Sequence, residues 1–221
     1  MGQINELKDF TRGQLDAALM KIGQDAGMGT ADGIRAFLAN ELTVSKPTRR
    51  FREKDGVIYL KDGVIYLSVV SDGTTGPEWI ERLEGKDSRL GDYAKQLLLS
   101  KDFTPTKGVE YKVAILKGTF FSDEDRITKK IRAEANKRKW GKPNAEMACL
   151  IRENFSDEEI EAMGLIWVVV MHEPIKDSGG DPRLLGADRG GGGRWLGAYY
   201  GRPGRGWLRG GGFAFVSQVS A

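Results

Sequence analysis

The sequence predicts an α+β fold, and three patterns carry this prediction. Two short apolar runs, 165–171 and 213–219, have the length and composition of buried strands. The run 109–116 (VEYKVAIL) alternates polar and apolar residues, as a strand with one buried face does. Several other segments place apolar residues at helical spacing, some of them behind acidic, capping starts. Helices and strands therefore mix along the chain, and its last third is rich in loops.

The first 46 residues are predicted to form a small helical unit (1–46) ahead of an α+β domain that spans 51–221. Apolar residues recur at roughly helical spacing over 3–22, and Thr30 can cap a second helix that holds Phe37. Pro47 and the basic residues after it are typical of a linker.

A direct tandem repeat follows, with KDGVIYL at 54–60 and again at 61–67. Seven is an odd number, so one continuous strand would turn the equivalent side chains of the two copies to opposite faces. Asp62 and Gly63 form a strong turn signal, which favours a hairpin with the second copy as the return strand. A duplication with one copy extruded as a loop is an equally open alternative.

Further helices are predicted on both sides of the strand at 109–116. Residues 78–83 and 89–99 form two of them before it. After it, the acidic stretch 122–125 is a capped helix start, and the basic residues 137–139 close that helix, as the helix dipole prefers. Asn144 opens another helix, and a capping box at Ser156 opens one more, which ends at Gly164.

The composition is that of a globular protein with one cysteine. Hydrophobic residues make up 40% of the chain and charged residues 29%, which is too apolar for a disordered protein. A single cysteine cannot form an intrachain disulfide and fits a reducing compartment. The longest apolar run, 164–171, is far shorter than the ~20 residues of a membrane-spanning helix, and the N-terminus lacks a signal-peptide pattern. We expect a cytoplasmic protein without a membrane span.

Few residues are candidates for catalysis. His172 and Glu173 follow a predicted strand, where catalytic residues often lie, and Cys149 with His172 is a conceivable nucleophilic dyad. Cys149 lies on an amphipathic helix, however, where a packed, inert thiol is the usual occupant. Because His172 is the only histidine, no multi-histidine metal site can form. We expect no enzymatic activity, no bound metal and no cofactor.

Two charged features admit both a binding and a structural interpretation. Asp177, Asp181 and Asp188 are suitable calcium ligands, but their spacing matches no EF-hand loop, and turn formation beside glycine and proline explains them. The basic run 126–142 could contact phosphates, but the acids at 123–125 dilute its field, and a solvated helix face is the commoner meaning.

The most unusual segment is 179–212. Fourteen of these 34 residues are glycine, and six arginines face two aspartates, which gives a local charge of +4 in a chain whose total is +3. Trp195, Tyr199, Tyr200 and Trp207 punctuate the segment, and the predicted strand 213–219 closes it. A glycine-rich stretch anchored between regular elements is typical of a binding surface.

Two binding functions fit this segment. Arginines for phosphates and aromatic rings for bases are typical of single-stranded nucleic-acid binders of the RGG type, although such tracts are repetitive and terminal. The second function, binding by a surface that mutation has diversified, is indicated by the residue types that are absent: from Asp177 to Ser217 there is no Lys, Glu, Gln, Met or Asn. Replacing the adenines of asparagine codons (AAY, where Y is a pyrimidine) with any base gives codons for Gly, Arg, Leu, Tyr, Asp and others. It never gives a codon for Lys, Glu, Gln, Met or Trp, or a stop codon.

On these residues the segment resembles the variable proteins of diversity-generating retroelements. The matching stretches are LLGADR (184–189), GRWL (193–196), AYYG (198–201), Pro203, the Trp-Leu-Arg at 207–209 and the closing GFAFVSQVS (212–220). In that family, adenine-directed mutagenesis of a C-terminal variable region, here 181–221, changes side chains on a fixed main chain. The resemblance implies a C-type-lectin-like fold and a ligand-binding protein whose partner is an unknown protein or other macromolecule, nucleic acid being the alternative.

The resemblance also implies a division of the segment into varied and scaffold positions. Four aromatic residues would be scaffold filling the core: Trp195, Trp207, Phe213 and Phe215. Of the varied positions, Tyr199, Arg202, Arg205 and Leu208 would provide most of the contact area for an acidic or aromatic ligand. The varied, ligand-binding positions would be Gly190, Gly191, Gly192, Gly197, Tyr199, Gly201, Arg202, Gly204, Arg205, Gly206, Leu208, Gly210 and Gly211.

Overall fold

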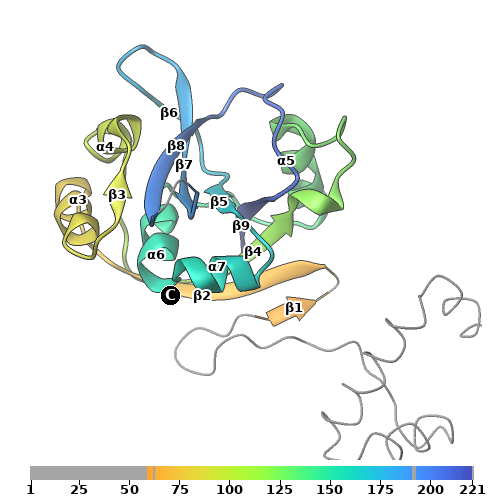
Figure 1. The fold of residues 1–221 in the computed structure, drawn as a ribbon, viewed down its shortest axis with the longest axis horizontal. Helices are drawn as coiled ribbons and strands as arrows, with labels where there is room; N and C mark the ends of the chain where they lie inside the picture. Colours follow the sequence, from red (N-terminus) through yellow and green to blue (C-terminus); the bar gives the residue numbers. More distant parts are fainter. Residues whose placement is uncertain (1–58, 62, 191–192, 221) are drawn as a thin grey trace, which may run out of the picture. The chain divides into compact units, whose positions relative to one another are not determined.

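The computed structural model describes residues 59–61, 63–190 and 193–220, and it combines helices with one large open sheet (Figure 1). The α+β prediction is confirmed. The helical unit predicted for 1–46 lies outside the described residues, which all belong to the contact unit Thr48–Ala221. Among the described residues, none of the helices is long and apolar enough to cross a membrane.

The described strands form a mixed sheet in the order β1-β2-β4-β9-β5-β7-β8-β3, with β6 paired to β7. Neighbouring strands are antiparallel except for β5 with β9 and β3 with β8, which are parallel. The bounds are β1 Tyr59–Lys61, β2 Val64–Asp72, β3 Arg89–Leu90, β4 Lys107–Lys117, β5 Trp167–Val170, β6 Ile175–Lys176, β7 Pro182–Asp188, β8 Trp195–Tyr200 and β9 Gly211–Ser220.

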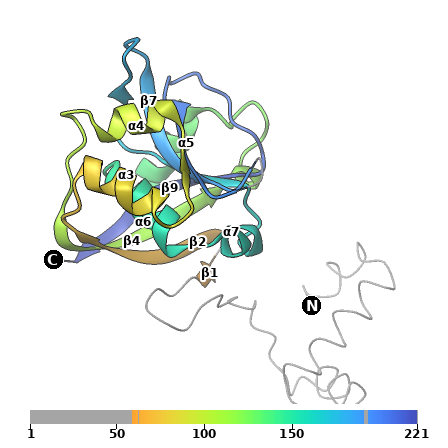
Figure 2. The same cartoon turned by 60° about the vertical axis from the view of Figure 1, so that its left-hand side comes forward.

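The helices cover both faces of this sheet. They are α3 Gly76–Glu84, α4 Asp92–Leu98, α5 Thr128–Lys137, α6 Glu146–Asn154 and α7 Asp157–Ala162, with a 3-10 turn, η2, at Gly118–Phe120. The helices α3, α4 and α6 lie on one side and α5 on the other (Figure 1), and Figure 2 turns the layer with α3 and α4 to the front. Both faces are therefore buried at the middle of the sheet, which explains why β5 is a continuous apolar run instead of an alternating one.

Side-chain alternation divides the core into two clusters. Val168 and Val170 of β5 join the cluster beneath α3, α4 and α6, where Trp79 is fully buried. Val169 of β5 and Phe213 of β9 join the cluster beneath α5. This second cluster contains the aromatic residues that position the C-terminal segment.

Most of the predicted elements are present, and two need correction. The capping box at Ser156 opens α7, with the Glu159 backbone N–H donating to Ser156 Oγ at 3.2 Å. The acidic stretch 122–125 does not open α5, which begins at Thr128 without a side-chain cap. The predicted helix at 89–99 is shorter, because Arg89 and Leu90 pair in parallel with β8 and only Asp92–Leu98 is helical.

The described residues of the tandem repeat, 59–61 and 63–67, form a hairpin. Tyr59 pairs with Tyr66 and Lys61 with Val64, so the second copy is the return strand. Gly63, in the turn, has φ +77°, a conformation that glycine adopts without a steric cost. The second copy is buried in the sheet, with Val64 and Leu67 nearly inaccessible, whereas β1 is the edge strand.

Removing one copy is expected to leave a folded protein. Deleting 61–67 or 54–60 gives the same sequence, because the copies are identical, so the remaining copy can supply β2. The loss is then the pairing of β1, and we expect less than about 2 kcal/mol in urea unfolding, since a backbone hydrogen bond contributes a net ~1 kcal/mol. Leu67→Ala in the full chain is the comparison, expected to cost about 2–5 kcal/mol. A deletion variant that does not fold would contradict this account of the repeat.

Candidate binding surface

The loop 201–210, called here the glycine-rich loop, is fixed by main-chain hydrogen bonds to the start of α5. The backbone N–H of Thr128 donates to the Arg205 carbonyl at 3.1 Å, and that of Lys129 donates to the Pro203 carbonyl at 2.9 Å. The backbone N–H of Trp207 donates to the Arg126 carbonyl at 2.9 Å. The first N–H groups of a helix have no partner inside it, so the loop carbonyls replace the missing side-chain cap of α5.

Trp207 fixes the same loop from the side of the core. Its side chain is only 7% exposed, and its indole N–H donates to Thr128 Oγ1 at 2.9 Å. Its ring lies 5.5 Å from that of Trp167, 6.0 Å from Tyr199 and 5.6 Å from Phe213, measured between centroids. These spacings are typical of favourable aromatic pairs.

Arg126 ties the loop to the end of β4. Its guanidinium is buried and donates to the carbonyls of Gly118 at 2.8 Å, Phe121 at 3.0 Å and Trp207 at 3.4 Å. Asp123 supplies its counter-charge at 2.7 Å. The first residue of the basic run 126–142 is thus part of the core, where a buried charge needs this full set of acceptors.

The remaining side chains of the loop point outward. Arg202, Gly204, Arg205, Gly206 and Leu208 are exposed, Leu208 by 73%. Tyr200, Arg202, Gly204 and Arg205 line a surface hollow of about 490 Å³. Arg202 pairs with Asp181, whereas Arg205 makes no ion pair within the described part of the chain. The loop therefore exposes basic, apolar and glycine residues, while hydrogen bonds to the start of α5 hold its main chain.

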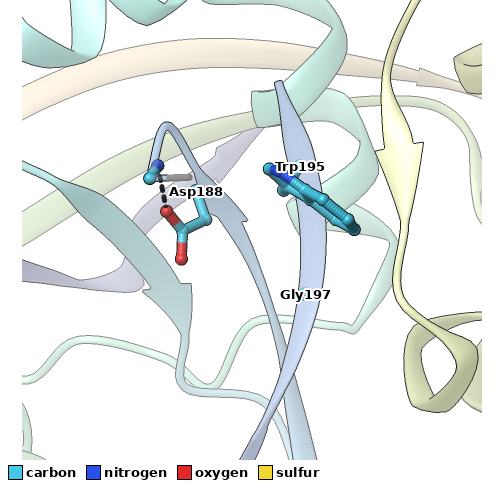
Figure 3. Close-up of a pocket in the computed structure, with 4 residues that line it drawn as sticks. Asp188, Trp195 and Gly197 are labelled. Atoms are coloured by element: carbon cyan, nitrogen blue, oxygen red, sulfur yellow. Dashed lines mark hydrogen bonds between the residues drawn. The ribbon is translucent and has the colours of Figure 1, made fainter. Parts of the chain in front are cut away.

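A second hollow, of about 280 Å³, lies on β7 and β8 and is lined by Asp188, Gly190, Trp195 and Gly197 (Figure 3). Asp188 and Trp195 are direct cross-strand partners, so their side chains project from the same face of the sheet. The Asp188 carboxylate accepts hydrogen bonds from the Gly190 N–H at 2.5 Å and the Tyr199 hydroxyl at 2.6 Å.

The Tyr199 side chain, which was expected to be a varied, ligand-contacting position, is therefore held by contacts within the protein. Its ring packs 5.9 Å from that of Trp167, and burial, together with the hydrogen bond to Asp188, raises the pKa of Tyr199 well above its usual value. A Cβ on Gly197 would lie 3.3 Å from the Tyr199 ring. A side chain at 197 therefore requires the Tyr199 ring to shift by a few tenths of an ångström.

Several residues of the expected varied and scaffold sets need correction. A side chain on Gly211 would overlap the ring of Trp167, so this position belongs to the fixed framework. A Cβ on Gly210 would lie 2.8 Å from Ile166, and one on Gly201 would lie 3.0 Å from Leu184, so both need a neighbour to move. Gly191 and Gly192 lie outside the described residues.

The four scaffold aromatics separate into two kinds. Trp207, Phe213 and Phe215 are buried in the cluster beneath α5. Trp195 does not fill the core: it is half-buried, and the Arg89 guanidinium carbon lies 5.6 Å from its ring centroid. It is a wall of the second hollow, because the alternation of β8 sends Leu196 into the core and turns Trp195 to the opposite face.

Of the candidate catalytic residues, His172 and Cys149 are held in the interior and Glu173 lies at the surface. His172 is 1% exposed, its Nε2 accepts the Leu185 N–H at 2.9 Å, and its Nδ1 donates to the Glu173 carbonyl at 2.6 Å. Burial lowers the pKa of His172 to about 4, and a smaller contribution from Arg132 acts in the same direction. Cys149 is fully buried, which raises the pKa of its thiol, and the Glu173 side chain pairs with Lys142 at the surface at 2.9 Å.

The aspartates and the basic helix have structural partners. Asp177 accepts the N–H groups of Gly179 and Asp181, both at 2.9 Å, and pairs with Arg183 at 2.8 Å, so it organises a turn. Within the described residues, no group of three or more His, Cys, Asp or Glu side chains could hold a metal ion.

On and next to α5, three basic side chains form ion pairs with two acidic ones. Lys130 pairs with Asp125, while Lys137 and Arg138 both pair with Glu134, at 3.6 and 2.9 Å. This pairing agrees with a solvated helix face.

Sequence reasoning missed the pairing of Asp188 with Tyr199. Asp188 was expected in a turn, but it ends β7 and faces β8. The signal that could have found it is the period of two in β8, which places Trp195, Gly197 and Tyr199 on one face.

Loss of the Trp207 side chain is expected to destabilise the protein by about 3–5 kcal/mol, as large buried aromatics do. Trp207→Ala also leaves the Thr128 hydroxyl without its donor. Leu208→Ala, one residue along and exposed, is the matched control and should change the free energy of unfolding by less than about 0.5 kcal/mol. Urea unfolding of both variants decides the matter, and equal effects would contradict the division into buried and displayed residues.

Acid is expected to destabilise the protein through His172. Its folded pKa of about 4 lies below the ordinary value of 6.5, so below pH 6.5 the unfolded chain binds a proton that the folded chain does not. The corresponding stability is complete above pH 6.5 and falls by up to about 3 kcal/mol as the pH drops to 4. NMR titration of this single histidine should give a midpoint near 4 in the folded protein and near 6.5 in urea. A folded midpoint above 6 would refute the buried, neutral state.

Comparison of the chain with protein-family models, with curated proteins and with solved structures found no match. The function is therefore inferred from the residues and geometry of the C-terminal surface.

Proposed function

We propose that this protein is a non-enzymatic ligand-binding protein whose C-terminal surface is diversified by retroelement-directed adenine mutagenesis, carried on a C-type-lectin-like domain. The observation that carries the proposal is the arrangement of the glycine-rich loop. Its contacts with α5 are made by main-chain atoms and by Trp207, whereas the residues at 202, 204, 205, 206 and 208 are exposed. Substitution at these five positions changes the surface without removing the bonds that hold it.

Genetic and structural constraints coincide at position 207, and a structural constraint acts at position 211. Adenine replacement in an AAY codon cannot produce Trp, and Trp207 is a residue that the loop needs for its position. Gly211 has no room for a side chain next to Trp167. A diversification mechanism that spares these codons would keep every variant folded, which is the condition for a useful library of surfaces.

The side chains at hand favour an acidic or aromatic ligand for this variant. Arg205, which forms no ion pair with another described residue, lines the same hollow as Tyr200, and Leu208 adds exposed apolar area. Arginine and aromatic residues are the usual anchors of protein interfaces, while glycine contributes little area. Because glycine occupies two of these five exposed positions, we expect weak affinity.

Single-stranded nucleic acid is the alternative ligand, since Arg202 and Arg205 line the same hollow as Tyr200 and could contact phosphates and a base. Arg202 already pairs with Asp181, however, and the Arg183 guanidinium already lies 3.7 Å from the Tyr200 ring centroid. Each phosphate neutralised in a single strand adds about 0.7 to the salt slope, so a steep salt dependence of binding would favour nucleic acid over a protein ligand.

The neighbouring DNA tests the proposal directly. We expect a near-copy of the C-terminal coding segment, close to a reverse transcriptase gene, that differs from the expressed copy at adenines of the template. The differences should fall on codons 202, 204, 205, 206 and 208 and should spare codons 207 and 211. Differences scattered over all four template bases, or concentrated on the codons of buried residues, would overturn the proposal.

A further inference from the structure

The second hollow, on β7 and β8, has the chemistry of a site for a cationic side chain. We propose that it binds the guanidinium of an arginine presented by a protein partner, between the carboxylate of Asp188 and the indole of Trp195. This inference deepens the proposed function, on which its biological meaning rests, by naming the chemical class of a partner group for one part of the surface.

The first argument is the state of the Asp188 carboxylate. Two hydrogen bonds, from the Gly190 N–H and the Tyr199 hydroxyl, hold it in one orientation. A carboxylate offers about four acceptor positions, so acceptor capacity remains on both oxygens. Within the described residues, no lysine or arginine forms an ion pair with this carboxylate. It is a fixed negative charge that lines an open hollow.

The second argument is the opposite wall. The Trp195 indole is half-buried and already attracts one guanidinium, that of Arg89, at 5.6 Å from its centroid. Indole is the strongest aromatic partner for a cation. A planar guanidinium can stack flat on the ring while its edge donates toward a carboxylate, whereas an ammonium is attracted by the ring but cannot stack on it. Asp188 and Trp195 are paired across adjacent strands, and both line the hollow (Figure 3).

The third argument is size. The hollow measures about 280 Å³, slightly below the roughly 300–1,000 Å³ of pockets that enclose drug-sized ligands. It fits the end of one side chain better than a whole small molecule. The space depends on glycine: Gly190 and Gly197 line it, and a Cβ at Gly190 would lie 3.0 Å from Asp188 Oδ1.

The test is an NMR titration of the full chain with N-acetyl-arginine amide, following the indole N–H of Trp195 and the amide of Gly190. The matched probe is N-acetyl-citrulline amide, which keeps the shape of the side chain and lacks its charge. We expect a dissociation constant on the order of millimolar for the arginine probe and no saturable shift with citrulline.

Three variants locate the binding. Asp188→Asn keeps the shape and one acceptor and should weaken the arginine probe at least about tenfold, because a charge-assisted hydrogen bond is lost. Gly197→Val should abolish binding by filling the hollow. Arg205→Gln, in the other hollow, is the control and should leave the affinity unchanged. Amide spectra show whether each variant is folded, and Trp195→Leu replaces Asp188→Asn if that variant does not fold.

The outcomes distinguish failure of the arginine site from failure of the proposed function. Equal binding of citrulline, an unchanged affinity in folded Asp188→Asn, or a lysine probe that binds as tightly as arginine would overturn the assignment. Those results would leave the proposed function intact, since it is tested on the coding DNA. Conversely, arginine binding without a template copy in the DNA would support this site and overturn only the mechanism of diversification.

Discussion

The structure depends on one constraint, the seating of the glycine-rich loop on the start of α5. A loop so rich in glycine loses a large conformational entropy when it becomes ordered, and few of its own side chains can compensate. The compensation comes from Trp207, whose ring enters the aromatic cluster and whose indole N–H bonds Thr128. It also comes from loop carbonyls that accept the free N–H groups of α5. The loop thus supplies acceptors for the helix N–H groups, and the helix holds the loop in one position.

This constraint separates the position of the main chain from the identity of the displayed side chains. Because the bonds to α5 use main-chain atoms and the Trp207 side chain, they do not depend on the side chains of the exposed residues. The second hollow obeys a different rule, since Tyr199 spans from the aromatic cluster to Asp188 and its ring lies against Gly197. Here the shape depends on which residues occupy a coupled pair of positions. One surface thus combines independent positions on the loop with coupled positions on β8.

The sequence predicted the elements whose signals are local. The apolar run at β5, the alternation at β4 and the capping box at Ser156 each depend on neighbouring residues. It did not predict the start of α5, because the groups that cap this helix are carbonyls of a loop far along the chain. It also placed Trp195 in the core and Asp188 in a turn, since cross-strand register, which sets their faces, is a long-range property. The division of the C-terminal segment into buried and displayed residues also required the register.

The central claim is that the glycine-rich loop holds one conformation in the free protein. Amide hydrogen exchange tests this most directly at the N–H groups of Thr128, Lys129 and Trp207, which bond across the contact between loop and helix. The account predicts protection at these three amides approaching that of the core strands β4 and β9, because they open only when the contact breaks. Exchange at the rate of an unstructured chain, in a protein whose core amides stay protected, would contradict it.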